Sequence, residues 1–229
     1  MELDHLFVLL RPDGPRDPLA ERLERATACL REAGLTEGSP NVHPGQGSAC
    51  RRFFFDNAMF ELLWLTDADA AARPPADLLA LPARAADPAA CPFGVAFRPS
   101  FAPNEPAAFA HERYRPAYLP EPLEIHVARG GSVNEPLWFH LPFVPPGRRR
   151  RDSPRGAPEP REHPAGIDRL TAIEITLPSA LGPLARSISA LQPIRWRRGE
   201  RFRLALIFDE ERCSRVVDPV DGLPVSLRF

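Results

Sequence analysis

HPGQGSACRRFFFDNAMFELLWL, residues 43–65, is the stretch of sequence that decides the fold. Within it, residues 51–56 and 58–65 are rich in aromatic and branched apolar side chains, which is typical of β-strands. Asp56 and Asn57 stand between the two runs, and this pair tolerates the left-handed backbone of a tight turn. The stretch is therefore predicted to form a β-hairpin.

Glu61 is the single carboxylate inside the second strand of that hairpin, between Phe60 and Leu62. A buried carboxylate without a partner costs several kcal/mol, so a cation, a metal or hydrogen-bond donors are expected close by. The alternatives are a neutralised buried pair with His5, an ion pair with Arg51 or Arg52, ligation of a metal, or the role of a general base.

The loop before the hairpin contains Gly45-Gln46-Gly47, which begins like a dinucleotide-binding fingerprint. Cys50 occupies the place of the third glycine, and a strand follows where a pyrophosphate site needs a helix. A Rossmann site is therefore not expected. The glycines indicate either a tight turn into the hairpin or a loop whose His43 and Gln46 side chains border a cavity and bind substrate.

The composition excludes several classes of function. With 29 basic and 30 acidic residues among 229, the charge is nearly balanced, so no affinity for nucleic acid or an acidic membrane surface is implied. Every basic residue is arginine, which excludes a Schiff-base lysine and P-loop chemistry. No run of about 18 apolar residues predicts a membrane helix. Four cysteines without CxxC spacing favour a reduced, cytoplasmic setting.

Residues 1–66 are predicted to form one βαβββ module. Residues 3–10 have the apolar character of a central strand. A helix is expected to start at Asp17-Pro18 and to stop at Gly34. Its apolar face consists of Leu19, Leu23, Ala26 and Leu30.

Residues 168–229 repeat this order of elements. Residues 168–177 resemble the first strand, a helix is expected from about residue 179 or 182, and further strands follow to the C-terminus. An internal duplication is therefore visible in outline. The predicted fold class is α+β, with two paired βαβββ modules forming an open curled sheet, a cup with its helices outside.

The middle part, residues 67–167, is predicted to be an insertion within the same compact domain. Three strands are expected at 93–97, 123–127 and 137–141. Residues 67–92 suggest a loop with one helical turn. Residues 145–164 are rich in Pro and Arg and are predicted to be a mobile linker.

Some residues beside these middle strands are candidates for contacts with a small molecule. An extended, proline-flanked segment carries Tyr114, Arg115 and Tyr118, and Arg98 ends the strand at 93–97. Guanidinium groups and phenols in such places suit the anchoring of an anionic small molecule. We expect these residues, together with Arg52, to bind substrate.

Several motifs together resemble those of bacterial glyoxalase-like proteins in the vicinal oxygen chelate (glyoxalase/bleomycin resistance/dioxygenase) superfamily. The resemblance covers most of the chain except the Pro/Arg segment. The motifs are LDHLF (3–7), EGSPNVHPGQG (37–47), RRFFF (51–55), LLW (62–64), PFG (92–94), RPAYLPEP (115–122) and PLWF (136–139).

The resemblance implies a ligand cavity inside the cup and, in metal-using members, a divalent cation held by a His on the first strand and a Glu on the fourth strand of each module. His5 and Glu61 occupy these positions in residues 1–66, and such ligands suit Zn, Ni, Fe or Mn. Alignment of residues 168–229 places Ala172 and Ser226 at the corresponding positions. Half of the ligand set is then missing, and His126 or His140 would have to complete it.

Two functions remain open on the sequence. One is a lyase, isomerase or dioxygenase-type enzyme that acts on a small oxygenated or anionic metabolite, with His5 and Glu61 as catalytic residues. The other is a metal-free protein that binds or sequesters a small molecule in the same cup. The sequence also leaves open whether the cup closes within one chain or within a homodimer.

Overall fold

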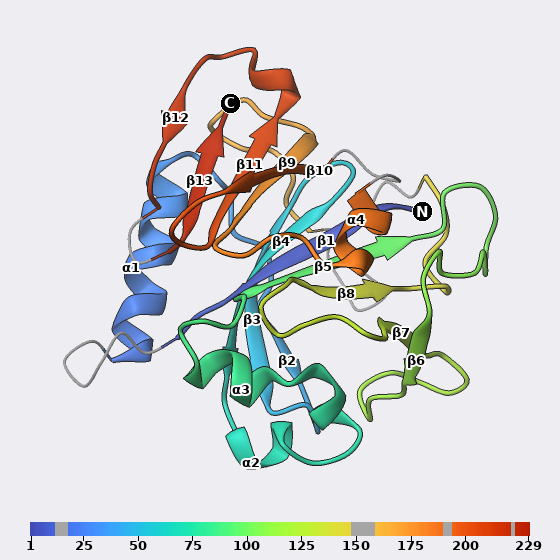
Figure 1. The fold of residues 1–229 in the computed structure, drawn as a ribbon. Coiled ribbons are helices and arrows are strands. Elements are labelled where there is room, and N and C mark those ends of the chain that lie inside the picture. Colours follow the sequence, from blue (N-terminus) through green and yellow to red (C-terminus); the bar gives the residue numbers. More distant parts are fainter. Residues whose placement is uncertain (12–17, 148–158, 190–193, 221–222) are drawn as a thin grey trace.

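The computed structural model describes residues 1–11, 18–147, 159–189, 194–220 and 223–229. These residues form two β-sheets with short helices around them (Figure 1). The larger sheet has eight strands in the order β2-β3-β4-β1-β5-β8-β7-β6, and it is curled and open. The expected α+β class and open, cup-like sheet are thus confirmed.

The first half of the curled sheet is the βαβββ module expected for residues 1–66. Its elements are β1 (Glu2–Leu9), α1 (Leu19–Glu32), β2 (Asn41–His43), β3 (Ser48–Phe54) and β4 (Met59–Leu65). Strands β3 and β4 form the expected hairpin, with Arg52 directly opposite Glu61. Strand β1 then pairs with β4 in parallel, which places His5 beside Met59.

The second half of the curled sheet comes from the middle of the chain. Its strands are β5 (Phe93–Arg98), β6 (His111–Tyr114), β7 (Ile125–Ala128) and β8 (Leu137–His140). Their order, β5-β8-β7-β6, repeats the order β1-β4-β3-β2 of the first module. Strand β5 pairs with β1 in antiparallel fashion and joins the two halves. The middle residues are therefore a second module whose first two strands are connected by a loop.

Residues 168–229 form the separate five-stranded sheet. Its elements are β9 (Leu170–Leu177), α4 (Pro183–Ser189), β10 (Ile194–Arg198), β11 (Arg203–Phe208), η2 (Asp209–Glu211), β12 (Val216–Val217) and β13 (Val225–Arg228). The strand order is β10-β9-β11-β13-β12. Its sequence of parallel and antiparallel pairs matches the run β4-β1-β5-β8-β7 in the curled sheet.

This topology corrects the expectation that residues 168–229 complete the cup begun by residues 1–66. Both regions have the expected order of elements, but the order alone does not specify which strands pair. The middle module was not predicted from the sequence because no helix separates its first two strands within the described residues 99–110. The smaller sheet instead has the same pattern of strand pairing as the centre of the curled sheet, with fewer strands.

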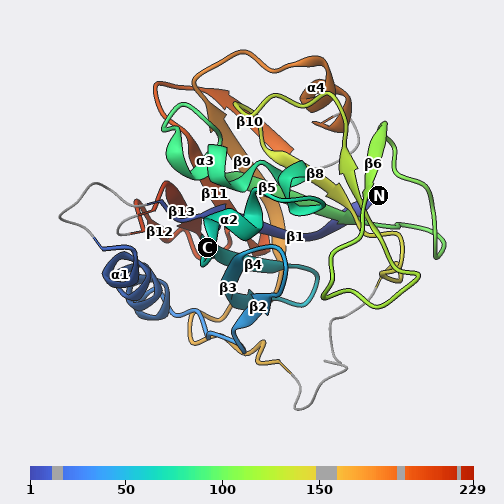
Figure 2. The same cartoon turned by 90° about the horizontal axis from the view of Figure 1, so that it is seen from below.

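The two faces of the curled sheet have different environments. Its outer face packs against α1 and the smaller sheet in one shared apolar core, which includes Leu6 and Phe60 from the curled sheet and Ile173 and Leu206 from the smaller one. Leu23, Ala26, Thr27 and Leu30 form the buried side of α1, close to the predicted face. Figures 1 and 2 show α1 and the smaller sheet on one side of the curled sheet.

The inner face of the curled sheet is covered by residues 67–92. This segment contains α2 (Ala68–Ala71), the 3₁₀ helix η1 (Ala76–Leu79) and α3 (Leu81–Ala86), more helix than the single turn expected. Leu79 and Leu81 pack against Phe7 and Leu63 of the sheet. These short helices therefore close part of the mouth of the cup.

Some expectations fall on residues outside the described ranges. Asp17, the expected start of the first helix, and residues 148–158 of the Pro/Arg segment are among them. The described end of that segment is held in place, contrary to the expectation of a mobile linker. His163 is buried, and its ring lies 2.9 Å from the carbonyl oxygen of Phe54 and 3.0 Å from the amide nitrogen of Thr36. None of the helices in the described ranges is long and apolar enough for a membrane crossing.

Candidate functional site

A cavity of about 300 Å³ lies on the inner face of the curled sheet. Most of its wall is apolar and comes from both modules and the covering helices, as with Phe7, Leu81 and Phe139. Its polar lining is formed by His5, Asn41, His43, Gln46, Arg52, Glu61, Tyr114 and Tyr118. An apolar pocket with a few convergent polar groups is the usual form of a small-molecule site.

Most of the predicted site residues come together in this cavity. They are His5, His43, Gln46, Arg52, Glu61, Tyr114 and Tyr118. The other two do not line it. Arg115 lies on the surface, with its guanidinium 2.8 Å from the Glu124 carboxylate. Arg98 lines a second cavity instead.

Glu61 is placed in the cavity by its position in the middle of β4, and only 7% of its surface is exposed. No ion pair of Glu61 exists within the described part of the chain, so the pairing with Arg51 or Arg52, one of the alternatives, is not formed. Arg51 instead pairs with Glu24, and the Arg52 guanidinium lies 3.1 Å from Glu159. Glu61 therefore presents a carboxylate to a largely apolar space.

The neighbour that Glu61 does have is the Cys50 thiol, which forms a side-chain hydrogen bond with it. Burial raises the pKa of this thiol, and the nearby Glu61 carboxylate raises it further. Cys50 is therefore a protonated donor. Burial and the Glu61 carboxylate thus outweigh the nearby Arg52, which alone would favour a reactive thiolate.

The His5 ring is oriented by the preceding residue. Its Nδ1 lies 2.8 Å from Oδ2 of Asp4, whose side chain is fully buried. The other carboxylate oxygen of Asp4 lies 3.3 Å from the Arg98 guanidinium. The β1–β5 pairing shifts register between Leu3 and His5, as at a β-bulge, and bulges commonly re-aim side chains. Asp4 was not among the site residues predicted from the sequence, although an acidic residue directly before His5 indicates a possible partner for its ring.

The glycine loop joins the two modules through one amide. Oε1 of Gln46 accepts hydrogen bonds from the hydroxyls of Tyr114, at 2.9 Å, and Tyr118, at 3.0 Å. On its other side the loop lies close to the segment after β4, because Gly47 has a φ of +67° and an added Cβ would lie 2.1 Å from the Asp67 carbonyl oxygen. Burial raises the pKa of both tyrosines, so their hydroxyls stay protonated.

His43 belongs to the same polar network. Its Nδ1 lies 3.0 Å from Oγ of Ser48, and its Nε2 lies 3.0 Å from the Asn41 amide nitrogen. Burial lowers the pKa of His43, more than the Glu61 carboxylate raises it. A neutral imidazole is therefore expected here at neutral pH.

The donor set does not suit the divalent metal that the family resemblance implies. On the inner face, Gly94 and Ala96 of β5 and Leu137 and Phe139 of β8 occupy the places where a second His and Glu would be needed. Nowhere in the described ranges do three His, Cys, Asp or Glu side chains gather in a way that could hold a metal. Zn, Ni, Fe or Mn would thus be left with His5 and Glu61, fewer ligands than catalytic sites usually have.

The residues considered as replacements lie elsewhere. Ala172 is in the smaller sheet and lines the second cavity, and Ser226 is in β13. His140 lies in β8 next to Trp138, whose side chain packs in the outer core, two residues away and thus on the same face. His126 is directly opposite His140 in β7. These two histidines therefore do not complete a site with His5.

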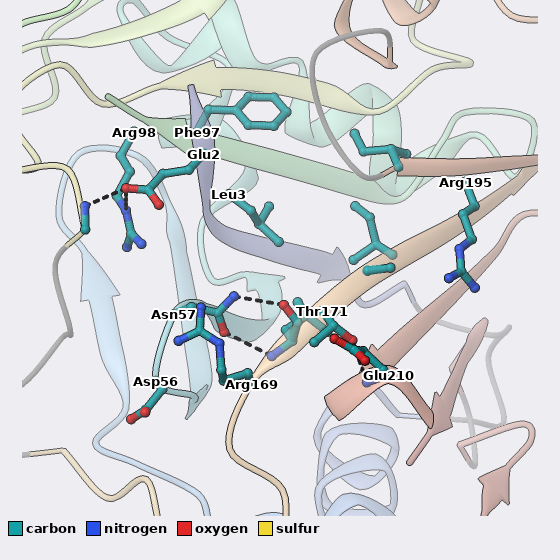
Figure 3. Close-up of a pocket in the computed structure, with 15 residues that line it drawn as sticks. Glu2, Leu3, Asp56, Asn57, Phe97, Arg98, Arg169, Thr171, Arg195 and Glu210 are labelled. Carbon is teal, nitrogen blue, oxygen red and sulfur yellow. Dashed lines mark hydrogen bonds and ion pairs between the residues drawn. The ribbon is translucent and has the colours of Figure 1, made fainter. Parts of the chain in front are cut away.

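The second cavity, of about 620 Å³, lies between the two sheets (Figure 3). Asn57 connects the sheets there, because its side chain donates to the Leu170 carbonyl oxygen at 2.8 Å and accepts from the Leu170 amide at 3.0 Å. Figure 3 shows Arg98 beside Glu2, and their ion pair measures 3.1 Å. Arg98 is thus a buried structural cation of β5, not a group that faces the cup.

Comparison with known proteins shows the fold alone. The sequence matches no protein-family model and none of the curated proteins. The structure is similar to the crystal structure of a hypothetical protein from Staphylococcus aureus, with a TM-score of 0.57 and 7% sequence identity. The match covers 99% of this chain and 98% of that one. Both sheets are therefore part of the shared fold.

Proposed function

We propose that the protein is a glyoxalase-like enzyme of the lyase or isomerase type, which acts on a small oxygenated molecule bound in the cup. The observation that carries the proposal is the placement of two titratable groups, Glu61 and His5, in one largely apolar cavity. Glu61 forms no ion pair within the described ranges, since Arg52 opposite it pairs with Glu159, and a carboxylate in such surroundings is suited to accept a proton. We assign it the role of general base.

His5 has a supporting role in this proposal. Its ring is fixed by Asp4 through Nδ1, so Nε2 is available to a bound molecule. A buried carboxylate that holds an imidazole in one tautomer is a recurrent arrangement in catalytic sites. The substrate would enter between the covering helices and the sheet, and the apolar wall would exclude water from the reacting atoms.

A second candidate is a metal-free protein that binds or sequesters a small molecule. The observation that favours it is the extent of the apolar lining, together with the way the polar groups of the glycine loop bond to one another. Such a cavity can hold a ligand without acting on it.

Turnover separates the two candidates. The full chain is incubated with an excess of a fractionated metabolite extract, and consumption of each compound is followed by mass spectrometry. The enzyme proposal predicts loss of one compound in amounts far above the protein concentration, and no such loss with Glu61→Gln. Stoichiometric retention of an unchanged compound, equal in both proteins, would favour the binder and overturn the enzyme. Glu112→Gln, an exposed carboxylate paired with Arg129, is the matched control.

A further inference from the structure

The hydroxyl and amide donors around the cup are directed at one another. The hydroxyls of Tyr114 and Tyr118 both donate to Oε1 of Gln46. The amide of Gln46 donates in turn to Oγ of Ser48, at 2.8 Å. Since each phenol has a single proton, the oxygens of the two tyrosines can offer only lone pairs to a molecule in the cavity.

His43 is occupied in the same way. The Asn41 amide donates to its Nε2, so the ring proton is on Nδ1, where it is donated to Ser48. Neither ring nitrogen of His43 is then left for a ligand. The polar groups from β2, the glycine loop and β6 thus bond mainly to one another, with both ring nitrogens of His43 and both phenol protons in use.

His5 presents an acceptor. A carboxylate can only accept, so Nδ1 of His5 must carry the proton that it shares with Asp4 at 2.8 Å. Asp4 is fully buried and Arg98 is 2% exposed, and their 3.3 Å contact places a cation beside the buried carboxylate. Nε2 of His5 is left with its lone pair, and His5 lines the cavity.

The guanidinium groups near the cup have partners elsewhere. The Arg52 guanidinium donates to the Ser39 carbonyl oxygen at 2.8 Å and pairs with Glu159 at 3.1 Å. Arg98 and Arg115 lie outside the cavity. Against these stand the carboxylate oxygens of Glu61, which face the cavity and have the Cys50 thiol as their neighbour. The Glu61 carboxylate and Nε2 of His5 are therefore the acceptors that the cup offers to a bound molecule.

We infer that the molecule bound in the cup presents hydrogen-bond donors, as a compact apolar compound that carries hydroxyl or ammonium groups, and is not a carboxylate or a phosphate ester. The inference rests on the proposed function in that it takes the cup as a small-molecule site. It replaces the expectation of an anionic ligand. The donors of the bound molecule would meet Glu61 and Nε2 of His5, and its apolar body would lie against Leu81 and Phe139.

Matched probes test this class of ligand. Three naphthalene derivatives differ only in one group: 2-naphthylmethylamine, 2-naphthylmethanol and 2-naphthoate. Their binding to the full chain is followed by the shifts of protein amide signals in NMR titrations. The amine and the alcohol should bind at least about tenfold more tightly than the carboxylate, because a carboxylate would meet the Glu61 carboxylate without a donor. Equal or tighter binding of 2-naphthoate would overturn the inference.

A variant shows which group sets the preference. Glu61→Gln keeps the shape and replaces one acceptor with an amide donor, so it should lower the affinity for the amine about tenfold and narrow the gap to the carboxylate. The control Glu112→Gln changes an exposed carboxylate on β6 and should leave all affinities unchanged. An unchanged preference in Glu61→Gln would contradict the assignment of Glu61 as the acceptor.

The protonation pattern of His5 can be measured without any ligand. The chain has six histidines, and selective ¹⁵N labelling with a His5→Gln variant identifies the signals of this ring. At pH 8 the inference requires a protonated Nδ1 and an unprotonated Nε2. A proton on Nε2 would make His5 a donor and overturn the inference even if the cup proved to be an enzyme site. Failure of every probe to bind, with the expected His5 pattern, would instead count against the proposed function.

Discussion

Arg52 lies directly opposite Glu61 in the β3–β4 ladder, yet its guanidinium pairs with Glu159 from the far end of the Pro/Arg segment. The ring of Phe54 lies 5.0 Å from the guanidinium carbon and supports it in that position. Cross-strand neighbours of opposite charge usually pair. Here the competing carboxylate draws the cation away, and the Glu61 carboxylate is left for the cavity.

Removal of the competing carboxylate should therefore change the cup. In Glu159→Gln the Arg52 guanidinium loses its ion pair and becomes free to turn toward Glu61. We expect affinity for 2-naphthylmethylamine to fall about threefold to tenfold. Stability should fall by about 1–3 kcal/mol, because the two side chains are only 18% and 10% exposed and Glu159 also accepts from the Ser39 amide. NMR titration and thermal unfolding measure the two effects.

The control for this change is Glu162→Gln, an exposed carboxylate in the same segment. It should alter neither quantity. If Glu159→Gln left the affinity for the amine unchanged, the commitment of Arg52 to Glu159 would not be what keeps Glu61 available.

Gly94 is a position where the inner face tolerates no side chain. A Cβ there would lie 2.1 Å from the ring of Phe7, which lines the cavity. Gly94→Ala should destabilise the protein by about 1–3 kcal/mol, the usual cost of overpacking, and should displace Phe7 into the cup. Chemical denaturation gives the free energy, and probe binding reports on the cavity.

Gly131→Ala offers the comparison, because its Cβ would meet only the end of the Leu184 side chain, at 3.3 Å. It should cost much less. Equal stability losses in the two variants would show that the close contact with Phe7 does not limit this position.

The hairpin could be predicted from the sequence because its signals are local. The apolar strands and the Asp56-Asn57 turn between them are contiguous, and the structure pairs them as expected. The partners of β1 are not local: β4 follows about fifty residues later and β5 about ninety. No local pattern indicates that β5 continues the sheet. Residues 168–229 were therefore wrongly predicted to form the second half of the cup.

For the candidate site too, local features could be predicted from the sequence and the consequences of distant strand pairing could not. His5 and Glu61 were recognisable as single polar groups on apolar strands, and both line the cavity. Arg115 and Tyr118 are three residues apart on one extended segment, but only Tyr118 reaches the cup, to donate to Gln46. Which side of such a segment faces inward depends on the pairing of β6 with β7, which the sequence does not show.

Acid should destabilise the protein through a buried histidine of the outer face. His140 is fully buried, and neither of its ring nitrogens has a hydrogen-bond partner in the described structure. Burial, together with the neighbouring His126 and the N-terminal amine, lowers its pKa to about 4, against the opposing effect of Glu105. The His126 ring lies 5.7 Å away and stacks on His111 at 3.9 Å.

The direction of this effect follows from the lowered pKa. The unfolded chain takes up the proton at about pH 6.5, whereas the folded chain resists it to about pH 4, so stability is lost as the pH falls between these values. The loss from His140 alone amounts to about 3 kcal/mol at pH 4. Urea unfolding from pH 7.5 to pH 4 in the protein and in His140→Leu measures it. An equal acid dependence in both would show that His140 does not carry the effect.

The metal content of the protein tests whether His5 and Glu61 are too few ligands to retain a divalent metal. The inner face supplies His5 and Glu61, while Gly94 and Phe139 line the part of the second module where further ligands would be needed. Two protein ligands rarely retain a transition metal, so protein purified without chelators or affinity tags should contain Zn, Ni, Fe or Mn well below one equivalent. Elemental analysis of the protein and of Glu61→Gln gives the answer. A full equivalent that is lost in Glu61→Gln would mean that the cup recruits ligands from a rearranged second module, and Glu61 would then be a metal ligand instead of a base.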